Sequence, residues 1–297
     1  MALTQKYPER IMVLANAALP QACRLAGEVS SFLRSLGVCS AHGSLNDETD
    51  LKALRIGEFD MLIALGGDGS MLRSGHLCAP LDIPLLGINI GHFGFLVELG
   101  ENEWQEKLPM LLEGEYRLEE RMMLQAACIR DGEKGESWDV INEVVVCRGQ
   151  YVRPIQVSAM MNDSFLTSYI ADGLIVATAT GSTAYALAAG GPILPPELRN
   201  ILLMPVAPHL SLDRAIILAE GASVSIGVKT RHEAVVSVDG RDPVIMHNDD
   251  QILVTANKKS LKMVRFQDPG YFYRNLTAYM EHNPMTSIKG NEHFVTK

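Results

Sequence analysis

A single carboxylate, Asp68, lies among the glycines of the stretch Gly66-Gly67-Asp68-Gly69, directly after the apolar residues 61–65. An apolar run that stops at glycines and continues into Ser70-Met71-Leu72-Arg73 predicts a strand, a turn and a helix, and ligands bind at the turn of such a unit. Glycines allow close backbone approach, and successive N–H groups before a helix can hold a phosphate. A negative charge does not fit the centre of a phosphate cradle. Asp68 is therefore predicted to be a base beside a phosphate rather than a phosphate ligand.

Arg73 has two interpretations. If Ser70 is the N-cap of the helix, Arg73 falls in the first turn, where a cation opposes the helix dipole by roughly 0.3–1 kcal/mol. A nearby anion would reverse that cost. Arg73 is then either a phosphate ligand beside Asp68 or a surface cation paired with an acidic side chain.

A second candidate region is the segment from Asp172 to Pro192, DGLIVATATGSTAYALAAGGP. It predicts a strand, a hydroxyl-rich turn and a helix of small residues over Thr183–Ala189. Small side chains let a ligand or another backbone approach closely, and the turn offers N–H and O–H donors. Tyr185 could stack on a flat base. The alternative is a tightly packed core helix with an N-cap.

Two polar residues, Asn142 and Glu143, interrupt the apolar run Val140–Cys147. Successive side chains of a strand point to opposite faces, so in a strand at least one of the two is expected to face a polar site. The alternative is that one face of this strand is solvated. Further along, Asp239-Gly240 after an apolar run predicts a hairpin turn.

Hydrophobic periodicity predicts two domains and a C-terminal helix. Strands at 11–16, 61–66 and 84–90 alternate with helices such as 21–36, which is typical of a doubly wound, mostly parallel sheet in an α/β N-terminal domain. From Tyr116 onward the sequence predicts a β-rich C-terminal domain, with strands at 122–129, 140–147, 155–161, 164–169, 174–178, 201–206, 215–218, 223–228, 234–238 and 252–256. The expected boundaries are 1–118 for the α/β domain, 119–270 for the β-rich domain, and 271–297 for a helix that packs back on the protein and a mobile tail.

Composition limits the partners. The chain of 297 residues has a formal net charge of −9, which disfavours nucleic acid and anionic membranes as partners because those need clustered Lys and Arg. Its five cysteines are widely spaced without a C-x-x-C pattern, so we expect a reducing, cytoplasmic location. No histidine spacing predicts a protein-bound metal.

Together these segments resemble the NAD kinase family, which phosphorylates NAD to NADP. The resemblance covers roughly residues 10–282. The GGDG turn alone is only moderately specific, because diacylglycerol kinases, sphingosine kinases and phosphofructokinases carry similar turns. The segment Asp172–Pro192 is more specific, and it follows GGDG, GINIGHFGFL and NEVVV in the family's order.

The resemblance implies that Asp68 accepts the proton of the 2′-hydroxyl of the adenosine ribose of NAD when the γ-phosphate of ATP is transferred. It further implies a divalent cation such as Mg²⁺ with ATP, and a homodimer or homotetramer. The implied NAD and phosphate contacts are Gly67, Gly69, Arg73, Phe95, Asn142, Glu143, Arg153, Asp172, Thr183, Ala184, Tyr185, Ala188 and Arg241. Among them, Phe95 would lie at the edge of the adenine pocket, and Asp172 would bind the nicotinamide amide or an adenine edge.

Five departures from the family pattern stand out. Ala179 replaces a common proline, Phe93 a usual leucine, and Leu210-Ser211 are in swapped order; these are interpreted as packing variations. Arg241 stands where Gln often occurs, so a cation there could contact a phosphate or alter nucleotide preference. Ile170 replaces a polar or basic residue, which predicts the loss of one NAD contact.

Two other functions compete with an NAD kinase. One is a lipid kinase that shares the GGDG turn, which the segment Asp172–Pro192 and the lack of a basic amphipathic stretch disfavour. The other is a non-catalytic dinucleotide-binding regulator, which would gain nothing from a base at Asp68. The choice of ATP or polyphosphate, the preference for NAD or NADH, and any allosteric inhibitor do not follow from the sequence.

Overall fold

The chain forms two compact units in a computed structural model that describes residues 7–91, 94–209 and 214–281. The first unit comprises Met1–Glu119 and Lys262–Lys297, and the second comprises Glu120–Leu261. In chain order, the second unit is therefore inserted into the first.

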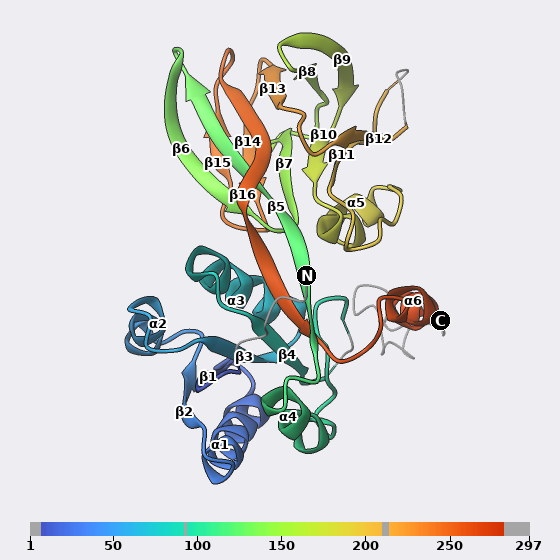
Figure 1. The fold of residues 1–297 in the computed structure, drawn as a ribbon. Helices are drawn as coiled ribbons and strands as arrows, with labels where there is room; N and C mark the ends of the chain where they lie inside the picture. Colours follow the sequence, from blue (N-terminus) through green and yellow to red (C-terminus); the bar gives the residue numbers. More distant parts are fainter. Residues whose placement is uncertain (1–6, 92–93, 210–213, 282–297) are drawn as a thin grey trace, which may run out of the picture. The chain divides into compact units, whose positions relative to one another are not determined.

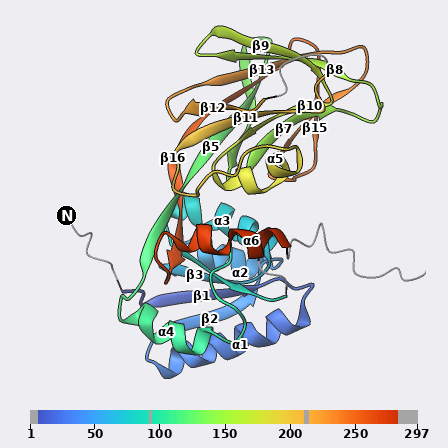
Figure 2. The same ribbon diagram turned by 90° about the vertical axis from the view of Figure 1, so that its right-hand side faces the viewer.

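Alternating strands and helices build the first unit, drawn in blue to green and in red in Figure 1. Its elements are β1 (Arg10–Ala15), α1 (Pro20–Ser35), β2 (Cys39–Ser44), α2 (Glu48–Arg55), β3 (Met61–Gly66), α3 (Asp68–Leu81), β4 (Leu85–Asn89), α4 (Trp104–Leu112) and α6 (Tyr271–Glu281). The parallel strands lie in the order β2-β1-β3-β4, and the end of β16 (Gln251–Arg265) joins beside β4 through Met263 and Leu85. Helices α1 and α4 cover one face of this sheet and α3 covers the other, as Figure 1 and Figure 2 both show.

The first unit forms these elements for simple reasons. Residues of β3 are buried on both faces, as expected of a parallel strand between two helical layers. Helix α1 begins with Pro20, which suits the first helical position, and it buries Ala22, Ala26, Val29 and Leu33 along one face. Helix α2 is capped by Asp47, whose side chain accepts the N–H of Thr49 at 2.8 Å.

The second unit is antiparallel. It contains most of β5 (Arg117–Arg130) and β16, together with β6 (Glu133–Val140), β7 (Glu143–Arg148), β8 (Ile155–Met161), β9 (Ser164–Ala171), β10 (Gly173–Ala177), η1 (Thr180–Thr183), α5 (Tyr185–Ala188), β11 (Asn200–Val206), β12 (Ile216–Ala219), β13 (Val224–Lys229), β14 (Ala234–Val238) and β15 (Val244–Met246). One sheet has the order β12-β11-β10-β7-β14-β15, and in the other β16-β13-β8-β9 are neighbours while β5 pairs with β16 and β6.

A large apolar cluster joins the two sheets of this unit, and a second apolar cluster packs β10 and β11 against α5. Alternate residues of both sheets are buried in the large cluster, among them Val144 and Val176 from one sheet and Val157, Ile226 and Val254 from the other. The fold class expected from the sequence, a mostly parallel α/β domain followed by a β-rich domain with a C-terminal helix, is confirmed. The tail predicted to be mobile, from Asn283 onward, lies outside the described residues.

Local details differ from the sequence predictions. The strand predicted over Val140–Cys147 is wrong, because β6 ends at Val140 and β7 begins at Glu143. The single helix predicted over Thr183–Ala189 is instead the short 3-10 helix η1 followed by α5, since Ala184 has φ −100° and ψ −127° and breaks the helical geometry. Strands β6 and β15 were not predicted. Their exposed polar residues and short length give no clear period-2 pattern.

Candidate active site

Asp68 is the first residue of α3, at the point where β3 ends. The turn requires glycine at Gly66, because it has φ +154° and an added Cβ would lie 2.3 Å from Ser70 Oγ. Gly67 is the N-cap residue. The prediction that Ser70 caps the helix is therefore wrong, and Arg73 lies in the second turn rather than the first.

The side chain of Asp68 is fixed by a second segment of the same unit. Asp68 Oδ2 accepts the N–H of Phe95 at 2.9 Å, and Oδ1 accepts the N–H of Leu96 at 3.0 Å. The backbone of Gly94 comes so close that an added Cβ would lie 2.1 Å from Asp68 Oδ1. Two backbone donors therefore set the orientation of a half-buried carboxylate.

A pocket of about 430 Å³ lies at the start of α3. Parallel strands present their carboxyl ends at one edge of a sheet, and this pocket gathers residues that follow β1, β2 and β3. Arg73 Nη1 donates to Asn46 Oδ1 at 3.2 Å within it. The helix start, a guanidinium and two amide side chains can hold phosphate oxygens. The lining residues are Asn16, Leu45, Asn46, Gly67, Gly69, Ser70 and Arg73.

In the second unit, Asp239 organises the residues before β7. Its Oδ2 accepts the N–H of Ile141 at 2.8 Å, and its Oδ1 accepts those of Asn142 at 2.8 Å and Glu143 at 3.0 Å. These bonds take the N–H groups that a continuous strand would use, which explains the break between β6 and β7. Asp239 also begins the predicted turn, which is confirmed as the connection between the antiparallel strands β14 and β15.

Glu143 is a buried acid. It is 7% exposed, and its Oε2 has no hydrogen-bond partner within the described part of the chain. Burial raises the pKa of Glu143 to about 7, the charge of Asp239 adds to this, and the backbone N–H of Tyr185 opposes it. A carboxyl group in this state can accept hydrogen bonds from the hydroxyl groups of a ligand or exchange a proton near neutral pH.

The turn between β10 and α5 is hydrogen-bonded to the same segment. Thr178 Oγ1 donates to Ile141 O at 2.6 Å and accepts the N–H of Gly181 at 3.0 Å. An added Cβ on Gly181 would lie 2.1 Å from Asn142 O, so only glycine allows this approach. The structure therefore brings Asn142 and Glu143 together with the predicted residues of η1 and α5, which are Thr183, Ala184, Tyr185 and Ala188.

Two of these residues are exposed, and Thr183 and Ala184 are half-buried. Tyr185 is 45% exposed and Ala188 is also exposed, whereas Ala186 on the opposite side of α5 is buried in the core. Ala179, the departure from the usual proline, is buried in the same apolar cluster.

Asp172 and Arg153 lie elsewhere in the second unit. In the pairing of β10 with β7, Gly173 is opposite Cys147 and Ala177 is opposite Glu143. Asp172 directly precedes β10 at the end away from Glu143, five residues or about 17 Å along the strand direction from the position opposite Glu143. Its Oδ1 forms an ion pair with Arg148 Nε at 3.1 Å, without a hydrogen bond between these two atoms.

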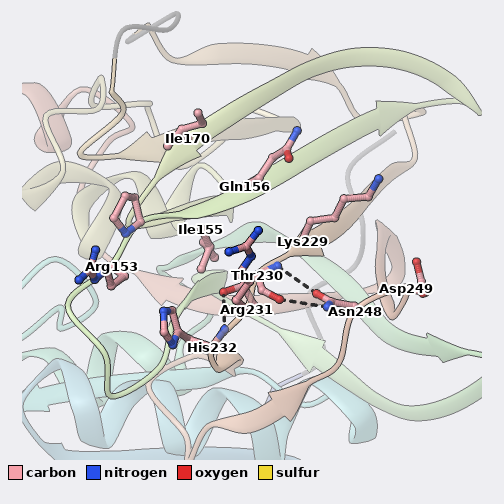
Figure 3. Close-up of a pocket in the computed structure, with 11 residues that line it drawn as sticks. Arg153, Ile155, Gln156, Ile170, Lys229, Thr230, Arg231, His232, Asn248 and Asp249 are labelled. Atoms are coloured by element: carbon pink, nitrogen blue, oxygen red, sulfur yellow. Dashed lines mark hydrogen bonds between the residues drawn. The ribbon is translucent and has the colours of Figure 1, made fainter.

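Arg153 lines a separate open pocket of about 720 Å³ in the second unit, shown in Figure 3. Ile170 also lines it and is 54% exposed, so this pocket has an apolar side chain where the family often has a polar or basic one. Lys229, Arg231 and His232 are further members. Arg241 lies apart from this pocket, exposed in the turn after β14.

Phe95 is half-buried and its ring contacts Phe272 of α6, with 6.2 Å between ring centroids. The departures Phe93 and Leu210-Ser211 lie outside the described residues. In the ranges that the structure describes, no three His, Cys, Asp or Glu side chains are placed to hold a metal ion. Within the same ranges, no helix is long and apolar enough to cross a bilayer.

Comparison with known proteins decides the family. A family model for the ATP-NAD kinase N-terminal domain matches residues 11–116, and one for the ATP-NAD kinase C-terminal domain matches residues 141–266. The NAD kinase of Chloroflexus aurantiacus is 37% identical over 270 residues, which cover 91% of this chain and 98% of that protein. The chain belongs to the NAD kinase family.

Further relatives agree with this membership. The NAD kinase of Dehalococcoides mccartyi is 35% identical over 288 residues, or 97% of this chain and 98% of that protein. The fold is similar to that of yeast NADH kinase complexed with NADH, with a TM-score of 0.82, 20% identity, and coverage of 96% of this chain and 91% of that one. It is also similar to an NAD kinase from Archaeoglobus fulgidus in complex with ATP, with a TM-score of 0.72, 23% identity, and coverage of 92% and 99%.

The expected NAD kinase activity is thereby confirmed, and the protein is an enzyme of this family. None of these relatives is a lipid kinase or a non-catalytic regulator. The sequence did not predict the roles of three residues. Gly94 lies beside the Asp68 carboxylate, Asp239 accepts the N–H groups of residues 141–143, and Asn46 accepts a hydrogen bond from Arg73. Only Asp239 carried a usable signal, because it was recognised as part of a turn.

Proposed function

We propose that Asp68 is the general base of the NAD kinase reaction. It would accept the proton of the 2′-hydroxyl of the adenosine ribose of NAD as that oxygen attacks the γ-phosphorus of ATP, giving NADP and ADP. The observation that supports this role is the carboxylate held by the N–H groups of Phe95 and Leu96 next to the pocket at the start of α3. A base must be oriented before it can act, and both oxygens of Asp68 have a fixed direction.

The phosphates of ATP are proposed to bind in the pocket at the start of α3. Phosphoryl transfer depends mainly on positioning and on neutralising charge, so N–H groups near Gly67 and Gly69 and the guanidinium of Arg73 suit it. The divalent cation is proposed to arrive with ATP. Mg²⁺ is commonly held by substrate phosphates and water with only one or two carboxylates, so it needs no cage of protein side chains.

Recognition of NAD is proposed to rest on the second unit. Glu143 and Asn142 offer acceptors for ribose hydroxyls or a base edge, while Tyr185 and the small residues of α5 offer an open face against which a flat ring can lie. Phe95 is proposed to lie beside the adenine. The remaining proposed contacts are Thr183, Ala184, Ala188, Arg153, Asp172 and Arg241.

We further propose a homodimer or homotetramer in the cytoplasm, and three regions with the boundaries 1–118, 119–270 and 271–297. The oligomer can be tested because Asp172 lies far from Glu143 along the direction of β10. If Asp172 and Arg153 bind the NAD held by a second copy of the chain, a mixed oligomer of Asp68→Asn and Asp172→Ala subunits contains one site with both residues intact. Mixing the two proteins should then restore activity that neither has alone.

The base assignment is tested by an assay with purified protein, NAD, ATP and Mg²⁺, in which a coupled dehydrogenase reports NADP. Asp68→Asn should lose most turnover while its affinity for NAD, measured by calorimetry, is kept. A variant that loses NAD affinity but retains turnover per bound substrate would make Asp68 a ligand instead of the base.

A further inference from the structure

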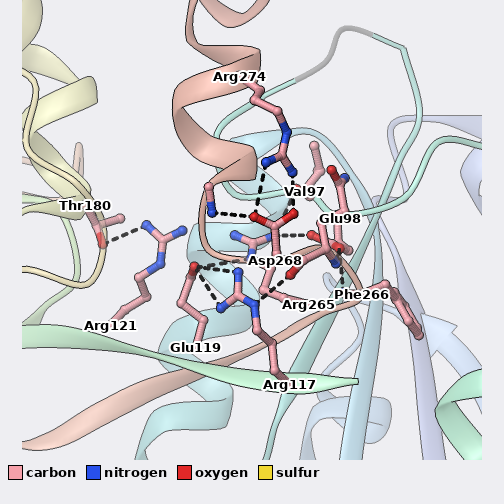
Figure 4. Close-up of polar contacts among 12 residues, drawn as sticks. Val97, Glu98, Arg117, Glu119, Arg121, Thr180, Arg265, Phe266, Asp268 and Arg274 are labelled. Carbon is pink, nitrogen blue, oxygen red and sulfur yellow. Dashed lines mark hydrogen bonds and ion pairs between the residues drawn. The ribbon is translucent and has the colours of Figure 1, made fainter. Parts of the chain in front are cut away.

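A buried and electrically balanced cluster lies in the first unit, at the end of β16. Arg265 is fully buried, and its Nε donates to Glu119 Oε1 at 3.1 Å while its Nη1 donates to Glu98 Oε2 at 3.0 Å. Arg117 forms a further ion pair with Glu119 at 3.4 Å. Figure 4 shows the two guanidinium groups and the two carboxylates directed toward one another.

This cluster holds one particular loop. Arg265 Nη1 also donates to the carbonyl oxygen of Val97 at 3.1 Å. The other carboxylate oxygen of Glu98, Oε1, accepts the N–H of Phe266 at 2.7 Å and lies 3.4 Å from that of Gln267. Residues 97 and 98 are therefore attached to the end of β16 through a carbonyl and both oxygens of a carboxylate.

The same loop holds Asp68. Phe95 and Leu96, whose N–H groups bind the Asp68 carboxylate, directly precede Val97. On the other side, Glu98 N donates to Gly87 O of β4 at 3.0 Å. A shift of residues 97–98 would move the two donors that orient the base, since only one peptide unit separates Leu96 N from the Val97 carbonyl.

We propose that Arg265 and Glu98 are positioning residues that keep the carboxylate of Asp68 oriented for proton transfer. The proposal rests on the proposed role of Asp68 as the base. Arg265 can act in this way because its planar fork reaches a carbonyl and two carboxylates at once, which an ammonium cannot do. Neither residue touches the reacting atoms.

The electrostatics of the cluster are consistent with this role. Burial raises the pKa of Glu98, although the charge of Arg265 opposes the rise. Burial also disfavours the charge of Arg265, but the facing Tyr271, Glu119 and Glu98 outweigh it and its pKa lies above the usual value. A buried ion pair adds little net stability over apolar residues, so its contribution here is a fixed geometry of the groups it joins.

The test uses near-isosteric variants, Glu98→Gln and Arg265→Lys, each made alone and together with Asp68→Asn. Glu98→Gln places an amide N–H₂ against either the Arg265 guanidinium or the Phe266 N–H. Arg265→Lys keeps the charge but loses the fork. Turnover would be measured with radiolabelled ATP, which detects the residual activity of Asp68→Asn, along with the KM for NAD and for ATP and the thermal midpoint of each protein.

We expect each single variant to lower kcat by about tenfold or more while each KM changes by less than about threefold, because a misoriented base affects the chemical step. In the Asp68→Asn background the same substitutions should change kcat by less than about twofold, since no base remains to be misplaced. Glu98→Asp, which keeps the charge, should recover part of the loss.

Lys262→Gln is the matched control. Lys262 lies on β16 three residues before Arg265 and forms an ion pair with the exposed Asp82 at 2.7 Å. The substitution therefore removes an ion pair of the same strand that does not involve residues 95–98. Its kcat should equal that of the wild type.

Three results would overturn the proposal: equal loss of kcat in both backgrounds, a change confined to KM, or full kcat in a folded Glu98→Gln or Arg265→Lys protein. If one variant does not fold at the assay temperature, the other and Glu98→Asp decide the outcome. Full turnover of Asp68→Asn alone would instead overturn the base assignment, which separates the two failures.

Discussion

The dipeptide Asp-Gly follows a strand in both units: Asp68-Gly69 begins α3 one residue after β3, and Asp239-Gly240 directly follows β14 in the turn to β15. Each aspartate accepts backbone N–H groups from a distant segment: residues 95 and 96 for Asp68, and residues 141, 142 and 143 for Asp239. Asp68 is half-buried between Gly67 and Gly69, which line the pocket at the start of α3, whereas Asp239 is 9% exposed.

The difference shows how the same local chemistry serves two purposes. The Asp239 carboxylate fixes the backbone of residues 141–143 and thereby places Glu143. At Asp68 the relation is the reverse, because the backbone N–H groups of residues 95 and 96 fix the direction of the carboxylate. Exposure separates the two cases, because a carboxylate can act on a substrate only where a substrate can reach it.

The largest effect is expected for Asp68→Asn. Loss of a general base should lower kcat by about 10²–10⁴-fold, with NAD binding retained. Steady-state kinetics with a coupled dehydrogenase and calorimetric titration of NAD would measure the two quantities. Unchanged kcat would remove the distinction between the two aspartates.

Asp239→Ala should act on stability first. It leaves three backbone N–H groups without their charged acceptor, which should lower the free energy of unfolding by about 3–5 kcal/mol. Urea unfolding followed by far-ultraviolet circular dichroism would measure this loss. An Asp239→Ala protein with wild-type stability and reduced kcat would mean that Asp239 has a chemical role instead.

Glu143→Gln should change the pH dependence of stability. The pKa of Glu143 is raised in the fold from 4.5 to about 7, so the folded protein binds more protons than the unfolded chain between these values, and this group's contribution falls as pH rises through that window. Above pH 7 the cost is at most on the order of 3 kcal/mol. Glu143→Gln should remove this pH dependence, and at pH 8 its midpoint of urea unfolding should lie at a higher urea concentration than that of the wild type.

The smallest effect is expected for Gly94→Ala. The added methyl group would lie 2.1 Å from Asp68 Oδ1, so the carboxylate or residues 94–96 must shift. We expect kcat to fall by about tenfold with little change in the unfolding midpoint. Gly221→Ala, where no atom lies within 4 Å of an added Cβ and φ is not in the left-handed region either, controls for the loss of glycine flexibility alone. Equal losses in both variants would attribute the effect to the backbone rather than to displacement of Asp68.

Local sequence patterns predicted the fold well where burial is periodic. The strand at Ala234–Val238 and the apolar face of α1 follow from side-chain spacing alone, because water exclusion acts on every second or every third and fourth residue. The turn at Asp68 was likewise predicted from its glycines and its carboxylate.

The remaining features depend on partners far apart in the sequence. Nothing near Val140 predicts that Asp239, almost a hundred residues later, takes the N–H groups of 141–143 and ends the strand. The helix begins at Asp68, so Gly67 is the cap in place of the expected Ser70, which lies in the first turn with its side chain against Gly66. Arg265 gave no signal either, since a lone arginine at the end of a strand is indistinguishable from a surface residue until Glu98 and Glu119 are found beside it.

The insertion of the second unit into the first has a consequence for biosynthesis. A ribosome makes Glu98 and Glu119 before the second unit and Arg265 only after it, with the 142 residues of Glu120–Leu261 in between. At about 5–20 residues per second, synthesis of these residues takes roughly 7–30 s, during which Glu98 and Glu119 lack the Arg265 guanidinium. The nascent first unit is therefore incomplete until nearly the whole chain has been synthesised, and the buried ion pairs of Arg265 with Glu98 and Glu119 are among the last contacts of this unit to form.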